Sequence, residues 1–154
     1  AVKHHECIPC FLKTWEQRWY LIAEPLNRKN PSVYALERTS NLQLTEQQLS
    51  PSPHINPQSY FEGCYGVNHE DCNPVPIKIK VYGSQVDYVR ARPIHASQEE
   101  VEQGDGWSVF SYWLRPSYNF YQMLLWHREK VEVMEPKEVR GEMKKIVNQI
   151  SKQY

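Results

Sequence analysis

Cationic and aromatic side chains gather in the first part of the chain, around Arg18-Trp19-Tyr20. On an extended strand alternate side chains share a face, so Arg18 and Tyr20 would lie on one side and Trp19 on the other. Lys13 stands before the turn that precedes Arg18, and Arg38 ends the predicted strand 32–38. If these strands pair as a meander, two or three cations converge around an aromatic ring, a chemistry suited to a phosphate, a base or both. The simpler alternative is that the cations are only solvated.

Thiols and imidazoles that could grip zinc occur at the start and in the middle of the chain, at His4, His5, Cys7, Cys10, Cys64 and Cys72. A structural zinc site usually takes its ligands from two well-separated pairs, and Cys64 and Cys72 match that spacing only loosely. We therefore expect no metal, and the sequence leaves the roles of all four cysteines open.

An enzyme would need a nucleophile or a phosphate-binding loop, and no G-x-S-x-G elbow, P-loop or G-x-G-x-x-G occurs. His95 and Ser97 stand two residues apart on a predicted strand over 93–102, so they would point the same way and could touch. A polar edge strand is the favoured explanation, and the acidic residues that follow suit a solvated edge. We expect no enzymatic activity and no cofactor.

Composition is that of an ordinary globular chain: 154 residues, 18 basic against 18 acidic, 40% apolar, with five Trp and ten Tyr. No stretch is long and apolar enough for a membrane span, and no secretion signal is apparent, so we expect a cytoplasmic protein with reduced thiols. No part is basic enough for a non-specific duplex-DNA surface. The chain opens without an initiator Met, and we expect it to be a piece of a longer protein.

Residues 1–50 are predicted to form a small β-domain. Short runs rich in apolar and aromatic residues predict strands at 10–15, 18–24, 32–38 and 41–46. Short strands on short loops favour a partial SH3-like or Sm-like barrel whose first strand is missing. Three prolines within 51–57 then mark a boundary, and residues 51–76 are predicted to be a linker with a short helix.

Residues 77–154 carry the most regular patterns. Ile77, Ile79 and Val81 alternate with polar or charged neighbours, which predicts a strand with one buried face. Patterns further along predict a helix from Ser84, strands at 93–102 and 107–114, a helix with Ser117 as N-cap, a strand at 130–134 and a last helix after Pro136. The fold class is therefore α+β, ending in a ferredoxin-like βαββαβ domain with a C-terminal helix.

An ordered series of segments resembles the WYL-domain transcriptional regulators. Trp19-Tyr20-Leu21 is the signature of that family, preceded by Pro9 and FLK and followed by YALERT. The second half resembles the extension that follows the WYL domain, through PIHASQ at 93–98, the segment 110–136 and the EVRGEMKKIV helix. Three positions depart from the family pattern: Cys10, Glu37 and Thr39.

The resemblance implies the effector-sensing and oligomerisation region of a bacterial-type transcriptional regulator. Its barrel would bind an anionic nucleotide or single-stranded nucleic acid through Lys13, Arg18, Trp19, Tyr20 and Arg38. Its extension would take part in homodimerisation, and its family-matching positions are secondary candidates: His95, Ser97, Gln98 and Arg115. DNA would be read by a helix-turn-helix domain that this chain does not include.

Two alternatives remain open from the sequence. One is a direct single-stranded nucleic-acid module that stacks bases on Trp15, Trp19 and Tyr20. The other is a purely structural dimerisation module that uses the strand 107–114 and the last helix as its surface.

Overall fold

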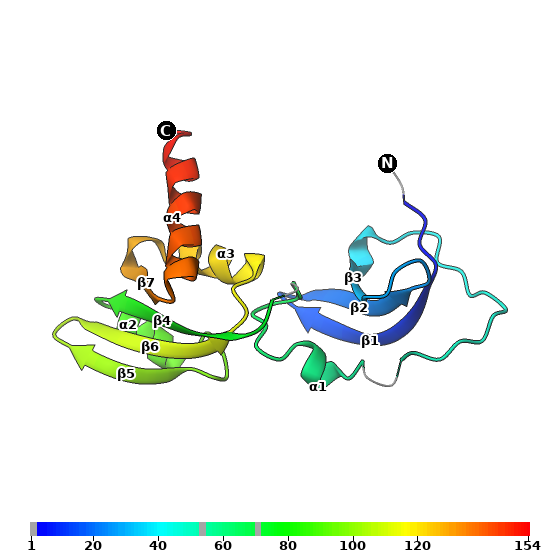
Figure 1. The fold of residues 1–154 in the computed structure, drawn as a ribbon, viewed down its shortest axis with the longest axis horizontal. Coiled ribbons are helices and arrows are strands. Elements are labelled where there is room, and N and C mark those ends of the chain that lie inside the picture. Colours follow the sequence, from blue (N-terminus) through cyan, green and yellow to red (C-terminus); the bar gives the residue numbers. More distant parts are fainter. Residues whose placement is uncertain (1–2, 53–54, 70–71) are drawn as a thin grey trace. The chain divides into compact units, whose positions relative to one another are not determined.

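The chain folds into two compact units, Ala1–Glu62 and Gly63–Tyr154, in a computed structural model that describes residues 3–52, 55–69 and 72–154. Each unit contains its own antiparallel sheet (Figure 1). The mixed α+β class is therefore confirmed. The division falls at Glu62 and Gly63, inside the segment 51–76 that the sequence predicts to be a linker.

The first unit is built on a three-stranded sheet in the order β1-β2-β3. Its strands are β1 (Cys7–Trp15), β2 (Arg18–Pro25) and β3 (Ser32–Ala35). Glu16 and Gln17 join β1 to β2 with φ angles of 47° and 62°, the positive values that a tight two-residue hairpin requires. The sheet stays open, and the described residues form no closed barrel.

Two of the predicted strands in this unit need correction. The strand expected over 32–38 ends at Ala35, and the chain turns into the 3-10 helix η1 (Leu36–Arg38). The strand expected over 41–46 is irregular, with Leu42 and Leu44 exposed by 77% and 101%. Alternating leucines predict a strand only where a surface can bury them, and these leucines have none.

A short segment after the long loop packs against the first sheet. Helix α1 (Pro57–Tyr60) is capped at its N-terminus by Asn56, whose side chain accepts a hydrogen bond from the Gln58 backbone N–H (2.8 Å). The rings of Tyr60 and Phe61 meet the Phe11 ring edge-on, with centroids 6.0 and 6.1 Å away. Residues 57–61 therefore pack as part of the first unit.

The second unit is a four-stranded sheet in the order β5-β6-β4-β7, with helices. Its elements run in the predicted strand, helix, strand, strand, helix, strand, helix order: β4 (Val75–Tyr82), α2 (Gln85–Ala91), β5 (Glu99–Gly104), β6 (Trp107–Leu114), α3 (Tyr118–Trp126), η2 (Arg128–Lys130), β7 (Val131–Glu135) and α4 (Lys137–Ser151). The strand expected over 93–102 is shorter than predicted, because β5 begins only at Glu99.

The core of the second unit lies on one face of this sheet. Ile77, Ile79 and Val81 of β4 are fully buried, as their alternation predicts, and they join one cluster with Phe110 and Phe120. Each such side chain gains about 1.5–3 kcal/mol by leaving water. Buried residues of α2, α3 and the start of α4 belong to the same cluster, so all three helices cover that face.

Helix α4 extends beyond the core it caps. Val139 in its first turn is buried in the core, whereas Val147 and Ile150 on later turns are 47% and 38% exposed. Figure 1 shows the helix standing away from the sheet. Val147 and Ile150 therefore form an apolar stripe of α4 that is partly exposed.

Candidate functional site

The candidate site lies at the turn end of the β1–β2 hairpin. The register pairs Lys13 with Tyr20 and Trp15 with Arg18. Residues opposite each other in an antiparallel pair share a face. Lys13, Trp15, Arg18 and Tyr20 therefore lie on one face of the sheet, which we call the hairpin-end face.

The hairpin-end face is partly packed. The Lys13 ammonium lies 4.5 Å from the centre of the Phe61 ring, a cation–π distance that holds its half-buried side chain over the α1 segment. Tyr20 is half buried, whereas the Arg18 side chain is 58% exposed. Arg18 is thus the cation of this face most open to a ligand.

Trp19 lies on the opposite face, where the register pairs it with Thr14. Its side chain is 53% exposed, and the nearby Leu12 is 54% exposed. This face is therefore half open, and Trp19 is available for contact.

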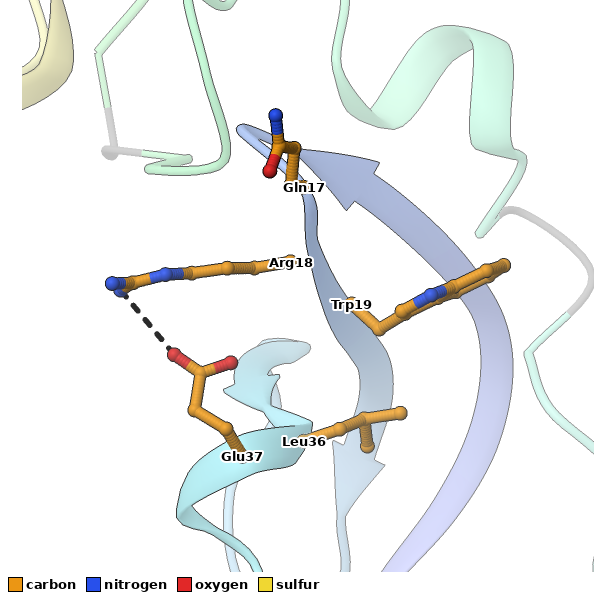
Figure 2. A pocket seen from close by; sticks show the side chains of 5 residues that line it. All are labelled: Gln17, Arg18, Trp19, Leu36 and Glu37. Atoms are coloured by element: carbon orange, nitrogen blue, oxygen red, sulfur yellow. Dashed lines mark ion pairs between the residues drawn. The ribbon is translucent and has the colours of Figure 1, made fainter.

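The predicted meeting of Arg18 and Arg38 must be corrected. It required a strand that reaches Arg38, but the chain is already in η1 there, so Arg38 does not continue the strand face of Arg18. Instead, Glu37 of η1 forms an ion pair with Arg18, with 3.3 Å between Arg18 Nη1 and Glu37 Oε1 (Figure 2). Arg38 itself is exposed.

An open pocket surrounds this ion pair. It has a volume of about 510 Å³ and is lined by five residues: Gln17, Arg18, Trp19, Leu36 and Glu37. We call it the Arg18–Glu37 pocket. Its size lies within the range of small-molecule sites. The sequence analysis did not identify Gln17, Leu36 and Glu37 as lining residues. The one indication in the sequence was that Glu37 departs from the pattern of the WYL-domain regulators.

The secondary candidates His95, Ser97 and Gln98 lie in a turn before β5, which replaces the strand predicted there. His95 Nδ1 and Ser97 Oγ do touch, at 2.8 Å, and Ser97 Oγ also accepts a hydrogen bond from the Trp113 backbone N–H (2.9 Å). Burial lowers the pKa of His95, which favours the neutral imidazole.

Gln98 and Arg115 make hydrogen bonds within the second unit. Gln98 Oε1 accepts from the Ile94 N–H (3.0 Å) and the Tyr112 hydroxyl (2.9 Å), and its amide donates to the Val89 carbonyl (3.0 Å). The Arg115 guanidinium donates to the Cys72 carbonyl. These contacts fasten loops to the sheet and its helices.

Cys7 and Cys10 are free thiols. Burial raises the pKa of Cys7 and Cys10, which keeps both protonated and poorly nucleophilic. No group of three His, Cys, Asp or Glu side chains within 3–52, 55–69 and 72–154 is arranged to hold a metal ion. Over the same residues, no helix has the length and apolar character needed to cross a membrane.

Comparison with known families defines the class of this chain. The model of the WCX domain matches residues 73–151, so the chain belongs to the WCX-domain family. This domain is found in WYL-domain proteins, and the match supports a relationship to the WYL family.

Among solved structures, the chain is similar to Proteasome accessory factor B/C (PafBC) of Arthrobacter aurescens, with 17% identity and a TM-score of 0.39. The similarity covers 90% of this chain and 21% of that chain, so the present chain spans about a fifth of its length. No curated protein matches the sequence.

Proposed function

We propose that the chain is the effector-sensing and oligomerisation region of a WYL-type transcriptional regulator, without enzymatic activity. Its first unit would be a partial SH3-like or Sm-like barrel, and its second a ferredoxin-like extension. The WCX match over 73–151 supports the class. The observation that carries the sensing role is the register that brings Lys13, Arg18 and Tyr20 to one face beside an open pocket.

The proposed ligand is anionic and nucleotide-like. Arg18 would bind it, Lys13 and the exposed Arg38 would add positive charge, and Tyr20 and Trp19 would contribute ring contacts. Each charge-assisted hydrogen bond would contribute about 1.5–3 kcal/mol. The exposed Arg18–Glu37 pair is worth about 0–1 kcal/mol, so a ligand can rearrange it at small cost.

Ligand binding would change DNA binding by changing how two copies of the regulator assemble. The exposed apolar stripe of α4 favours a homodimer, because a helix face of this kind gains by burial against a second copy. A ligand with unequal affinity for two dimer arrangements would shift the balance between them. DNA would be contacted by a helix-turn-helix domain elsewhere in the full-length regulator, which would act in the cytoplasm.

Titration of the purified chain with nucleotides, followed by calorimetry, tests the sensing role. Arg18→Ala is expected to weaken binding by about tenfold or more, since it removes a charge-assisted hydrogen bond. Arg28→Ala is the matched control, because Arg28 is an exposed arginine in the loop after β2 and does not line the pocket. Equal affinities in the two variants and the parent chain would rule out the site.

Exposed Trp19 favours one alternative, a platform that stacks the bases of single-stranded nucleic acid. A platform binds longer strands more tightly and loses affinity steeply with salt, whereas a mononucleotide pocket saturates with one residue. Titration of oligonucleotides of increasing length at two salt concentrations, with Trp19→Ala as the test variant, separates the two functions.

A further inference from the structure

We infer that the Arg18–Glu37 pair reads the hydrogen-bonding edge of the base of the ligand, and that guanine is the base it selects. The inference rests on the proposed nucleotide-sensing function. It assigns the identity of the base to the Arg18–Glu37 pocket.

The charge balance of the pocket argues against a phosphate site. Of the five lining residues only Arg18 and Glu37 are charged, and their charges are opposite. A bare anion placed beside Arg18 is therefore also repelled by Glu37, a few ångströms away. A neutral group that offers both donors and acceptors meets no such penalty.

The ion pair leaves most of its hydrogen-bonding capacity unused. A guanidinium carries five N–H donors and a carboxylate two acceptor oxygens, and the closest approach of this pair is 3.3 Å, between Nη1 and Oε1. The two side chains are 58% and 43% exposed. Figure 2 shows them reaching toward each other from β2 and η1. Adjacent donors and acceptors are thus presented together at one site.

Guanine matches this arrangement better than the other bases. Its O6 and N7 accept from a guanidinium, and its neighbouring N1–H and N2–H groups can donate in parallel to the two oxygens of a carboxylate. Adenine and cytosine offer a single exocyclic amino group on that edge, and uracil a single ring N–H. Leu36 and Trp19 also line the pocket, but the Trp19 ring points to the opposite side of β2 from Arg18 (Figure 2), so the selectivity rests on the hydrogen-bonding groups of Arg18 and Glu37.

Nucleosides are the appropriate probes, because they carry the base without the phosphate. Guanosine is expected to bind the chain at least about tenfold more tightly than adenosine, cytidine or uridine, the discrimination of one good bidentate contact. Glu37→Gln keeps the shape of the side chain but replaces one acceptor oxygen by a donor, and it is expected to remove the preference. Glu16→Gln is the control, since Glu16 is an exposed carboxylate that does not line the pocket.

The outcomes separate this inference from the function on which it rests. A guanosine preference that Glu37→Gln abolishes and Glu16→Gln retains supports the assignment. Binding of nucleotides without a guanosine preference among the nucleosides, or a preference that survives Glu37→Gln, overturns it while the sensing role stands. Absence of binding by every nucleoside and nucleotide overturns both.

Discussion

Arg90 and Glu100 are joined by two parallel hydrogen bonds, from Nε to Oε2 (2.9 Å) and from Nη2 to Oε1 (2.6 Å). The pair ties α2 to the edge strand β5, and Arg90 also donates to the Ser108 hydroxyl (3.1 Å). The hydrogen bonds from Arg90, followed by that from Ser108, lower the pKa of Glu100 from 4.5 to about 2. This carboxylate is therefore held in its charged form.

The lowered pKa of Glu100 predicts a pH dependence of stability. The pKa of this carboxyl group is lower in the folded chain than in the unfolded chain, where it is 4.5. Its contribution to stability is therefore complete at pH values above 4.5. That contribution is lost as the pH falls from 4.5 toward 2. In Glu100→Gln the free energy of unfolding is expected to fall less steeply over this pH range, as measured by urea denaturation at a series of pH values. The exposed neighbour Glu99 serves as control, and an equal effect of Glu99→Gln would contradict the assignment.

The hydroxyl of Tyr34 predicts a substitution that does not destabilise the first unit. This oxygen is buried and has no hydrogen-bond partner among the described residues, an arrangement that costs about 1–3 kcal/mol. Tyr34→Phe keeps the ring, which contacts His5 edge-on with centroids 5.3 Å apart, and removes the hydroxyl. The free energy of unfolding is expected to stay unchanged or rise by about 1 kcal/mol in guanidinium denaturation.

Tyr82→Phe provides the contrast for this experiment. The Tyr82 hydroxyl donates to Glu132 at 2.8 Å, so its removal is expected to cost about 1 kcal/mol or more. A loss of stability in Tyr34→Phe as large as that in Tyr82→Phe would mean that the Tyr34 hydroxyl is satisfied in the folded chain.

The N-cap of α3 predicts the cost of losing one hydroxyl. Ser117 is fully buried, and its side chain accepts the Phe120 backbone N–H (3.4 Å), as the sequence predicts. Ser117→Ala is expected to destabilise the second unit by about 1 kcal/mol, measured by the midpoint of thermal unfolding. Ser84 is the matched control, since it precedes α2 without a side-chain capping bond. Equal losses in Ser117→Ala and Ser84→Ala would refute the capping role.

Patterns contained within a few residues allowed much of the second unit to be predicted. The alternation of Ile77, Ile79 and Val81 identifies the buried face of β4, and Ser117 marks the start of α3, because burial and capping are both decided locally. Ser84, from which the sequence predicts a helix, does not cap α2, since it has helical backbone angles and makes no capping bond. Position alone does not decide whether a hydroxyl turns toward the backbone.

Features set by distant parts of the chain could not be predicted in this way. Ser97 is held in its turn by the backbone of Trp113, sixteen residues further on, so a strand pattern read from its neighbours fails there. At the candidate site, the same-face pattern correctly groups Arg18 with Tyr20. Strand β3 ends at Ala35, so Arg18 pairs with Glu37 and does not meet Arg38. The local pattern of residues does not indicate where this strand ends.

Two glycines of the second unit predict opposite effects of a single added methyl group. Gly141 lies inside α4 with open space around its Cβ position, so Gly141→Ala is expected to stabilise the unit by about 0.5–1 kcal/mol. At Gly104 a Cβ would overlap the Trp107 indole. The Lys80 ammonium lies over the same ring, 3.7 Å from its centre. Gly104→Ala is therefore expected to destabilise by about 1–3 kcal/mol in guanidinium denaturation. Unchanged or increased stability in Gly104→Ala would show that Trp107 does not pack against the β5 backbone.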